Sequence, residues 1–145
     1  MNILLLNGPN LNLLGEREPE IYGKTTLAEL EQMVRARAQE LGHGVRAFQS
    51  NHEGALIDKL HQERKWAKGV LFNPGAFTHS SYALRDAIVA VKLPVVEVHL
   101  SDITKREPWR RVSVLEEVCA HRVMGKGVQG YLEALEWLCS ERGAQ

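Results

Sequence analysis

The stretch NILLLN, residues 2–7, places four consecutive branched apolar side chains between two asparagines. A strand with one solvent-facing side alternates apolar and polar residues, whereas a strand covered by helices on both faces is apolar throughout. Residues 2–7 are therefore predicted to form a central strand of a parallel sheet. The residues that follow, GPNLN at positions 8–12, are typical of a loop.

Short apolar runs of this kind alternate with longer amphipathic stretches along the chain. Further strands are predicted at residues 44–50, 69–73, 94–100 and 122–124, and helices at residues 25–42, 53–67, 81–91 and 130–141. The helix at 25–42 has the clearest end signals, because Thr26 and Glu29 are spaced as a capping box and Gly42 follows the last turn. Alternation of strands and helices indicates βαβ units and an α/β fold.

The expected fold is a flavodoxin-like, doubly wound, five-stranded parallel sheet, which right-handed crossovers would order 2-1-3-4-5. Ligands of such sheets bind beyond the carboxyl ends of the strands, where the strand order reverses. The loops after the first, third and fourth predicted strands are rich in Asn, His and Ser: NGPNLN (7–12), NPGAFTHSS (73–81) and HLSD (99–102). We expect these three loops to meet in one crevice.

The bulk composition is that of a globular domain without a strong electric field. The chain has 145 residues, 44% of them hydrophobic, with 18 basic and 18 acidic side chains. A net charge of zero offers no general attraction for nucleic acid or an anionic membrane. Cys119 and Cys139 fit neither a disulfide framework nor a metal pattern, and no basic leader precedes the first strand. We expect a single domain over residues 1–145, reduced and cytoplasmic, with neither nucleic acid nor membrane as a partner.

The loop at residues 8–24 is unusually long for a compact domain. Loops of this length are usually functional or disordered, and five apolar side chains argue against disorder: Leu11, Leu13, Leu14, Ile21 and Tyr22. We interpret the loop as an active-site lid with Gly15 and Gly23 as hinges. The alternative is a packed surface loop without a role.

Arg17 and Tyr22 lie five residues apart in this loop. A tyrosine hydroxyl is a poor base near neutral pH unless a nearby cation favours the phenolate. Arg17 could supply that cation, and could also stabilise an oxyanion on a substrate. The alternative is an ordinary cation–π contact or a surface hydrogen bond between the two side chains.

His99 ends an otherwise apolar strand, and alternation places Glu97 on the same face. A carboxylate there could fix the tautomer of the imidazole and keep it ready to donate a proton. The alternative is a core histidine with a structural hydrogen bond.

The other polar candidates lie at the ends of the first and third strands and in the third helix. Asn10 and Asn73 can donate and accept hydrogen bonds at once, which suits a substrate with several hydroxyls. His79 is expected to begin the third helix, and Asp86, seven residues later, would lie near the same helical face. A plain surface role for Asp86 is the alternative.

Five blocks of the sequence together resemble type II 3-dehydroquinate dehydratase, an enzyme of the shikimate pathway. They cover nearly the whole chain in order: LLLNGPNLNLLGEREPEIYG (4–23), SNHEGALIDKLH (50–61), NPGAFTHSSYALRDAI (73–88), VEVHLSDITKREPWRRVSV (96–114) and GVQGYLEAL (127–135). The combination is specific, whereas any one short motif from it would not be.

The resemblance implies a hydro-lyase that converts 3-dehydroquinate to 3-dehydroshikimate by anti elimination of water through an enolate. Tyr22 would remove the proton alpha to the ketone, Arg17 would serve the chemistry of the lid, and His99, positioned by Glu97, would protonate the departing hydroxyl. The remaining implied roles are holding the site (Asn10), enolate stabilisation through a water (Asn73), binding of substrate hydroxyls (His79, Asp86 and Arg110) and binding of the substrate carboxylate by main chain (Leu100 and Ser101). The resemblance implies no metal, flavin or imine-forming lysine, and assembly as a dodecamer of trimers.

Four positions depart from the pattern of that family. Asp102 stands where Asn is usual, Phe77 where Tyr is common, Trp109 where Phe is common and Val112 where a polar residue is frequent. Asp102 matters most, because a carboxylate beside the carboxylate-binding turn would repel the substrate if it pointed inward. We expect it to point outward or to pair with Lys105 or Arg106.

Three other classes of protein compete with this interpretation. A flavodoxin-like binding module would share the topology, but NGPNLNLLG has a proline and bulky leucines where a phosphate-binding loop needs small residues. A metal hydrolase would need ligand spacing that the six histidines do not show. A catalytically inactive homologue would not be expected to keep Arg17, Tyr22 and His99.

Overall fold

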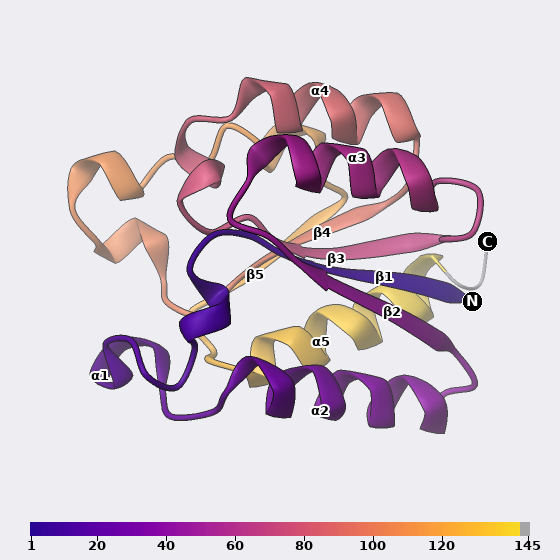
Figure 1. Cartoon of the computed structure of the whole chain (residues 1–145), viewed down its shortest axis with the longest axis horizontal. Helices are drawn as coiled ribbons and strands as arrows, with labels where there is room; N and C mark the ends of the chain where they lie inside the picture. Colours follow the sequence, from indigo (N-terminus) through magenta and orange to yellow (C-terminus); the bar gives the residue numbers. More distant parts are fainter. Residues whose placement is uncertain (143–145) are drawn as a thin grey trace.

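A five-stranded parallel sheet forms the middle layer of the molecule (Figure 1). The computed structural model describes residues 1–142. The strands are β1 (Asn2–Asn7), β2 (Gly44–Gln49), β3 (Gly69–Asn73), β4 (Val95–His99) and β5 (His121–Met124), and their order is β2-β1-β3-β4-β5. Every neighbouring pair is parallel. The predicted fold class and strand order are confirmed.

Helices cover both faces of the sheet. In Figure 1, α3 (Glu53–Glu63) and α4 (Tyr82–Val91) lie above the sheet, and α2 (Leu27–Glu40) and α5 (Gln129–Trp137) lie below it. The last helix continues into a π-helical turn, Leu138–Arg142. Helix α3 ends four residues before the predicted end, because residues 64–67 turn toward β3 and Lys68 N donates to Asn2 O at 2.7 Å. No helix within residues 1–142 is long and apolar enough to cross a membrane.

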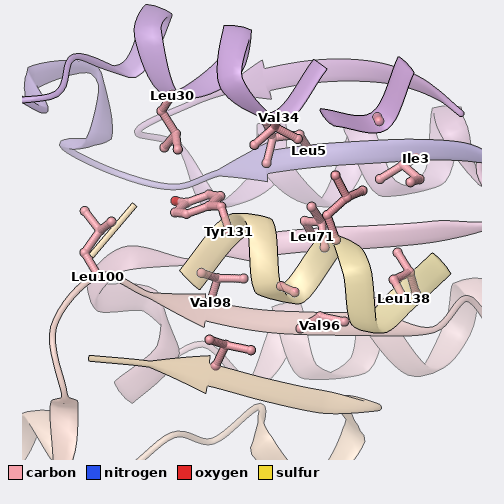
Figure 2. Packing of buried hydrophobic residues seen from close by; sticks show 14 of the residues in the cluster. Ile3, Leu5, Leu30, Val34, Leu71, Val96, Val98, Leu100, Tyr131 and Leu138 are labelled. Atoms are coloured by element: carbon pink, nitrogen blue, oxygen red, sulfur yellow. The ribbon is translucent and has the colours of Figure 1, made fainter. Parts of the chain in front are cut away.

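The first strand divides its side chains between two apolar clusters. Ile3 and Leu5 pack into the cluster on the α2 and α5 side, which Figure 2 shows with Leu30 facing the sheet. Leu4 and Leu6 pack into the cluster on the α3 and α4 side. All four are fully buried, and complete burial of such a side chain stabilises a fold by roughly 1.5–3 kcal/mol. This two-sided burial explains why the strand is apolar throughout.

Capping side chains set the starts of two helices. The capping box of α2 is present, with Glu29 N donating to Thr26 Oγ1 at 3.2 Å and Thr26 N donating to Glu29 Oε1 at 3.3 Å. Helix α4 begins after Ser81, whose hydroxyl accepts from Leu84 N at 3.0 Å. The prediction that His79 begins this helix is wrong: His79 ends a separate 3₁₀ helix, η2 (Gly75–His79).

The long first loop carries local structure. It holds the 3₁₀ helix η1 (Leu11–Leu13) and the single-turn helix α1 (Pro19–Tyr22). Gly15 and Gly23, the predicted hinges, both have positive φ, at 93° and 84°. Figure 1 shows α1 at the same end of the molecule as the carboxyl ends of the strands. The loop therefore lies where a ligand of this fold would bind.

The loops after β1 and β3 touch at the point where the strand order reverses. Gly8 N donates to Asn73 O at 2.7 Å. A Cβ atom at Gly8 would lie 2.4 Å from the carbonyl oxygen of Pro74, which is a backbone atom and cannot rotate away. Glycine at this position is thus a requirement of the close approach between the two loops.

We expect Gly8→Ala to destabilise the protein by roughly 1–3 kcal/mol, because the added methyl group must push the two loops apart. The matched control is Gly54→Ala in α3, where an added Cβ meets nothing within 4 Å and should stabilise the helix by about 0.5–1 kcal/mol. Urea unfolding of the two variants and the wild type measures both changes. Equal stability of Gly8→Ala and wild type would show that the loops are not in this contact.

Candidate active site

A cavity of about 140 Å³ lies beyond the carboxyl ends of β1, β3 and β4. Nine of the eleven predicted site residues line it: Asn10, Arg17, Tyr22, Asn73, His79, His99, Leu100, Ser101 and Arg110. Five residues that the sequence analysis did not select line it as well: Leu11, Gly75, Ala76, Ile103 and Arg106. The three polar loops therefore meet, as predicted, and the first loop adds Arg17 and Tyr22 to them.

Glu97 and His99 form a pair at the end of β4. His99 Nε2 lies 2.6 Å from Glu97 Oε2, and both side chains are buried, with Glu97 fully inaccessible. The carboxylate also accepts hydrogen bonds from the hydroxyls of Thr78, at 2.5 Å, and Ser113, at 2.9 Å. Burial by itself would raise the pKa of Glu97, but the hydrogen bond and charge of His99 and the two hydroxyls outweigh it and lower that pKa. Glu97 is therefore an anion at neutral pH.

This pairing determines which nitrogen of His99 is available. An anionic carboxylate only accepts hydrogen bonds, so the proton of the neutral imidazole resides on Nε2. The other nitrogen, Nδ1, has no hydrogen-bond partner within the part of the chain that the structure describes, and His99 lines the cavity. Nδ1 is the atom that a ligand would meet.

Two arginines lie against the ring of Tyr22, and the guanidinium carbon of Arg106 is 5.7 Å from the ring centre. The guanidinium carbon of Arg17 lies 4.8 Å from the centre of the tyrosine ring. Arg106 Nη1 donates to the Tyr22 hydroxyl at 3.1 Å and to Ser101 Oγ at 3.2 Å. The cation–π contact considered for Arg17 is thus present, and the cation at the hydroxyl is Arg106. Sequence reasoning missed Arg106 because it is one of several charges in TKREPWRR (104–111), with no local signal of which one turns inward.

His79 is held as a neutral ring with one nitrogen exposed to the cavity. Its Nδ1 lies 2.8 Å from the carbonyl oxygen of Val112, which can only accept, so Nδ1 carries the proton. Burial lowers the pKa of His79, and the charges of His99 and Arg110 add to that effect. Nε2 is then an acceptor, which suits a hydroxyl group that donates.

Asn73 belongs to a hydrogen-bond chain with a fixed direction. Gly75 N donates to Asn73 Oδ1 at 3.0 Å, which fixes the orientation of the amide. Asn73 Nδ2 then donates to the buried Tyr131 hydroxyl at 2.9 Å, and that hydroxyl donates to Asn7 Oδ1 at 2.6 Å. Since Nδ2 has two hydrogens, Asn73 retains one N–H to offer to the cavity.

Comparison with known proteins finds relatives that match nearly the whole chain. Residues 1–139 match the family model described as dehydroquinase class II. The chain belongs to the class II dehydroquinase family. It is 53% identical over 143 residues to the 3-dehydroquinate dehydratase of Bacillus pumilus, covering 99% of this chain and 97% of the relative. It is 52% identical over 135 residues to the catabolic 3-dehydroquinase 1 of Neosartorya fischeri, covering 93% of this chain and 90% of the relative.

A solved structure of the family supports the fold directly. The type II dehydroquinase from Butyrivibrio crossotus superimposes with a TM-score of 0.95 and 44% sequence identity, covering 97% of this chain and 98% of that one. The fold of this chain is therefore that of a type II dehydroquinase.

Asp102, the most consequential departure from the family pattern, does not line the cavity. Its carboxylate accepts from Thr104 N at 3.0 Å and from Thr104 Oγ1 at 2.6 Å, and so caps the 3₁₀ helix η3 (Ile103–Lys105). These hydrogen bonds, and the charge of Lys105, lower the pKa of Asp102. The carboxylate therefore lies outside this cavity, with Thr104 as its hydrogen-bond partner rather than Arg106.

The other three departures are compatible with the site. Val112 supports His79 through its backbone carbonyl, so a polar side chain is not needed there. The rings of Trp109 and His79 are nearly perpendicular, with their centres 5.4 Å apart. The guanidinium carbon of Arg110 lies 4.0 Å from the centre of the Trp109 ring. Phe77 is partly buried against the apolar cluster beneath α3 and α4.

Among the residues predicted to bind the ligand, Asp86 is the one that does not line the cavity. It lies exposed on α4 and is absent from the cavity lining. The reason is the break after His79: Ser81 starts a new helix, so the predicted seven-residue spacing along one helix does not exist. Within residues 1–142, no group of three or more His, Cys, Asp or Glu side chains is placed to hold a metal ion.

We expect His79 to titrate below the ordinary histidine pKa of about 6.5, because its charged form is disfavoured by burial. The unfolded chain then takes up this proton at a higher pH than the folded chain. The stability that neutral His79 contributes is present above the unfolded pKa and is lost as the pH falls through the folded pKa. Urea unfolding at pH 7 and pH 5 measures the loss, and His79→Gln should reduce it.

His61→Gln is the matched control, since His61 lies on the exposed side of α3. It should leave the difference between the two pH values close to that of the wild type. If NMR showed the ring protons of His79 titrating above 6.5, the assignment of His79 as a neutral acceptor would be wrong.

Proposed function

We propose that this chain is a type II 3-dehydroquinate dehydratase. The reaction is the reversible anti elimination of water from 3-dehydroquinate to 3-dehydroshikimate through an enolate, and the protein acts as a hydro-lyase of the shikimate pathway. The observation that carries the proposal is one cavity lined by both a tyrosine with an arginine at its hydroxyl and a histidine backed by a buried carboxylate. These are a base and an acid, which an elimination requires at the same time.

Tyr22 acts as the base. Arg106 donates to its hydroxyl and so places a positive charge beside the oxygen that removes the proton alpha to the ketone. Arg17 lies over the ring and faces the same cavity. Its planar guanidinium holds the lid residue in place and faces the negative charge that develops on the substrate.

The enolate that forms next is stabilised by Asn73. The hydrogen-bond chain through Tyr131 uses one of the two Asn73 Nδ2 hydrogens, and Asn73 lines the cavity. Its second N–H donates to the enolate oxygen, either directly or through a water. Asn10 closes the neighbouring part of the cavity, and its backbone is held in the left-handed region at φ 70° by a hydrogen bond from its N–H to Asn51 Oδ1.

His99 acts as the acid. Its Nδ1 delivers the proton to the departing hydroxyl, and the anionic Glu97 stabilises the imidazolium before transfer. The main chain at Leu100 and Ser101 binds the substrate carboxylate, and His79 and Arg110 bind hydroxyls. In this scheme each step is performed by side chains and main chain of the protein, without a metal, a flavin or a lysine imine.

We further propose that the protein works in the cytoplasm as a homo-oligomer, a dodecamer of trimers. Two free cysteines suit a reducing compartment. Asp86, exposed on α4, could contact substrate only in the cavity of a neighbouring copy. The proposal that Asp86 binds substrate hydroxyls therefore requires that copies of this chain assemble. The residues proposed for catalysis all belong to one domain over residues 1–145.

The direct test mixes purified protein with 3-dehydroquinate and follows the ultraviolet absorbance of the conjugated enone. A parallel sample is treated with borohydride, which would trap an imine. Rising absorbance without inactivation supports elimination through an enolate. No product from folded protein would contradict the proposal and favour an inactive homologue or a flavodoxin-like ligand-binding module.

Tyr22→Phe keeps the ring that Arg17 contacts but loses the base. We expect kcat to fall by roughly 100-fold or more while substrate binding is largely kept. Steady-state kinetics and calorimetric titration measure the two quantities. Tyr82→Phe, an exposed tyrosine on α4 outside the cavity lining, is the control. Near-normal turnover of Tyr22→Phe would remove Tyr22 from its role.

His99→Ala removes the acid and leaves the base in place. Loss of water should fall by roughly 100-fold or more, while exchange of the alpha proton with solvent deuterium stays measurable. Mass spectrometry of recovered 3-dehydroquinate reports the exchange. If both processes stopped together, the assignment of separate base and acid residues would be unsupported.

A further inference from the structure

Ser113 is the side chain with the most hydrogen bonds to the acid pair, although it does not line the cavity. Its hydroxyl lies 2.9 Å from each oxygen of Glu97. It belongs to the segment 112–114, which lies between η4 (Pro108–Arg110) and η5 (Glu116–Val118). The neighbours of Ser113 hold other parts of the site: Val112 O accepts from His79, and Val114 N donates to Thr78 O at 2.8 Å.

The direction of the Ser113 hydrogen bond is fixed by the backbone. Leu115 N lies 3.2 Å and Glu116 N lies 3.1 Å from Ser113 Oγ, and a backbone N–H can only donate. These two donors occupy both lone pairs of the hydroxyl oxygen. The single hydrogen of the hydroxyl must then point to an acceptor, and the two oxygens of Glu97 are the nearest ones.

The Thr78 hydroxyl lies 3.2 Å from Ser113 Oγ, whose lone pairs are already occupied, and 2.5 Å from Glu97 Oε2. Thr78 has one hydroxyl hydrogen and donates it to Glu97 Oε2. Burial raises the pKa of Glu97, but the hydrogen bond and charge of His99 and the hydroxyls of Thr78 and Ser113 lower it below its ordinary value, so the carboxylate is an anion. It must therefore accept from His99 Nε2, which leaves Nδ1 facing the cavity.

We propose that Ser113 is a positioning residue for the acid. Two backbone N–H groups orient the Ser113 hydroxyl toward Glu97, and Glu97 in turn accepts from His99 Nε2, which sets the tautomer of the imidazole. This inference rests on the proposed function for its effect on catalysis, but the tautomer itself is independent of any substrate. A purely structural Ser113 would only cap the turn that begins the 3₁₀ helix η5 (Glu116–Val118).

The test compares Ser113→Ala with Ser113→Thr, which keeps the hydroxyl. In Ser113→Ala we expect loss of water to slow by roughly 10–100-fold, the cost of one hydrogen bond to a charged group. Exchange of the alpha proton with solvent deuterium should change by less than about threefold, because it depends on Tyr22. Ser113→Thr should restore the loss of water to within about threefold of wild type. Equal slowing of both processes, or of neither, would overturn the proposal.

Nitrogen-15 NMR of His99 provides a readout that needs no activity. In the wild type the neutral ring should carry its proton on Nε2, and Ser113→Ala should show a measurable fraction with the proton on Nδ1. Thr78→Val deletes the second hydroxyl at nearly constant volume and should shift the tautomer in the same direction. This variant replaces Ser113→Ala in the test if Ser113→Ala does not fold. Unchanged nitrogen shifts in the folded variants would contradict the proposal, whereas an inactive wild type with the Nε2–H tautomer would contradict only the proposed function.

Discussion

The buried carboxylate of Glu97 is the constraint around which the site is organised. A charge removed from water is costly unless it is paired and hydrogen-bonded, and Glu97 is fully inaccessible in a strand whose neighbours are apolar. Its partners come from three separate places in the sequence: Thr78 after β3, His99 at the end of β4, and Ser113 in the segment between β4 and β5. Satisfying this charge therefore fixes three segments relative to one another, and two of them, near residues 75–79 and 99–101, contribute residues to the cavity lining.

Tyr22 is held in a different way. Tyr22 is partly exposed on a one-turn helix, and its position depends on two arginines that approach from different parts of the chain. Arg17 contacts the ring from within the same loop, while Arg106 reaches the hydroxyl from the segment after β4. Tyr22 is thus held by two cations on a one-turn helix, whereas His99 is held by a buried hydrogen-bond network at the end of a strand. Under the proposed function, the base and the acid are therefore supported by different kinds of contact.

The three polar loops and the lining residues were largely predictable because parallel strands place all their carboxyl ends at one edge of a sheet. Knowledge of strand order was enough to bring Asn10, Asn73 and His99 together. Asp86 shows the limit of this reasoning. Its predicted position assumed one helix from His79 onward, but a serine cap two residues later started a new helix with a different direction. A helix start depends on which hydroxyl actually caps it, and the sequence NPGAFTHSS offers several.

The sequence alone determined the sheet, its strand order and the edge at which the chemistry lies, because apolar runs, caps and handed crossovers are properties of local segments. Only the tertiary structure decided that Arg106 reaches the Tyr22 hydroxyl, that Ser113 holds Glu97, and that Tyr131 orients Asn73. The partners in these three contacts lie 84, 16 and 58 residues apart. Such contacts depend on how the segment between β4 and β5 and the last helix pack back over the site. No periodicity or spacing records that packing, because it is set by the shape and charge of surfaces that meet only in the folded chain.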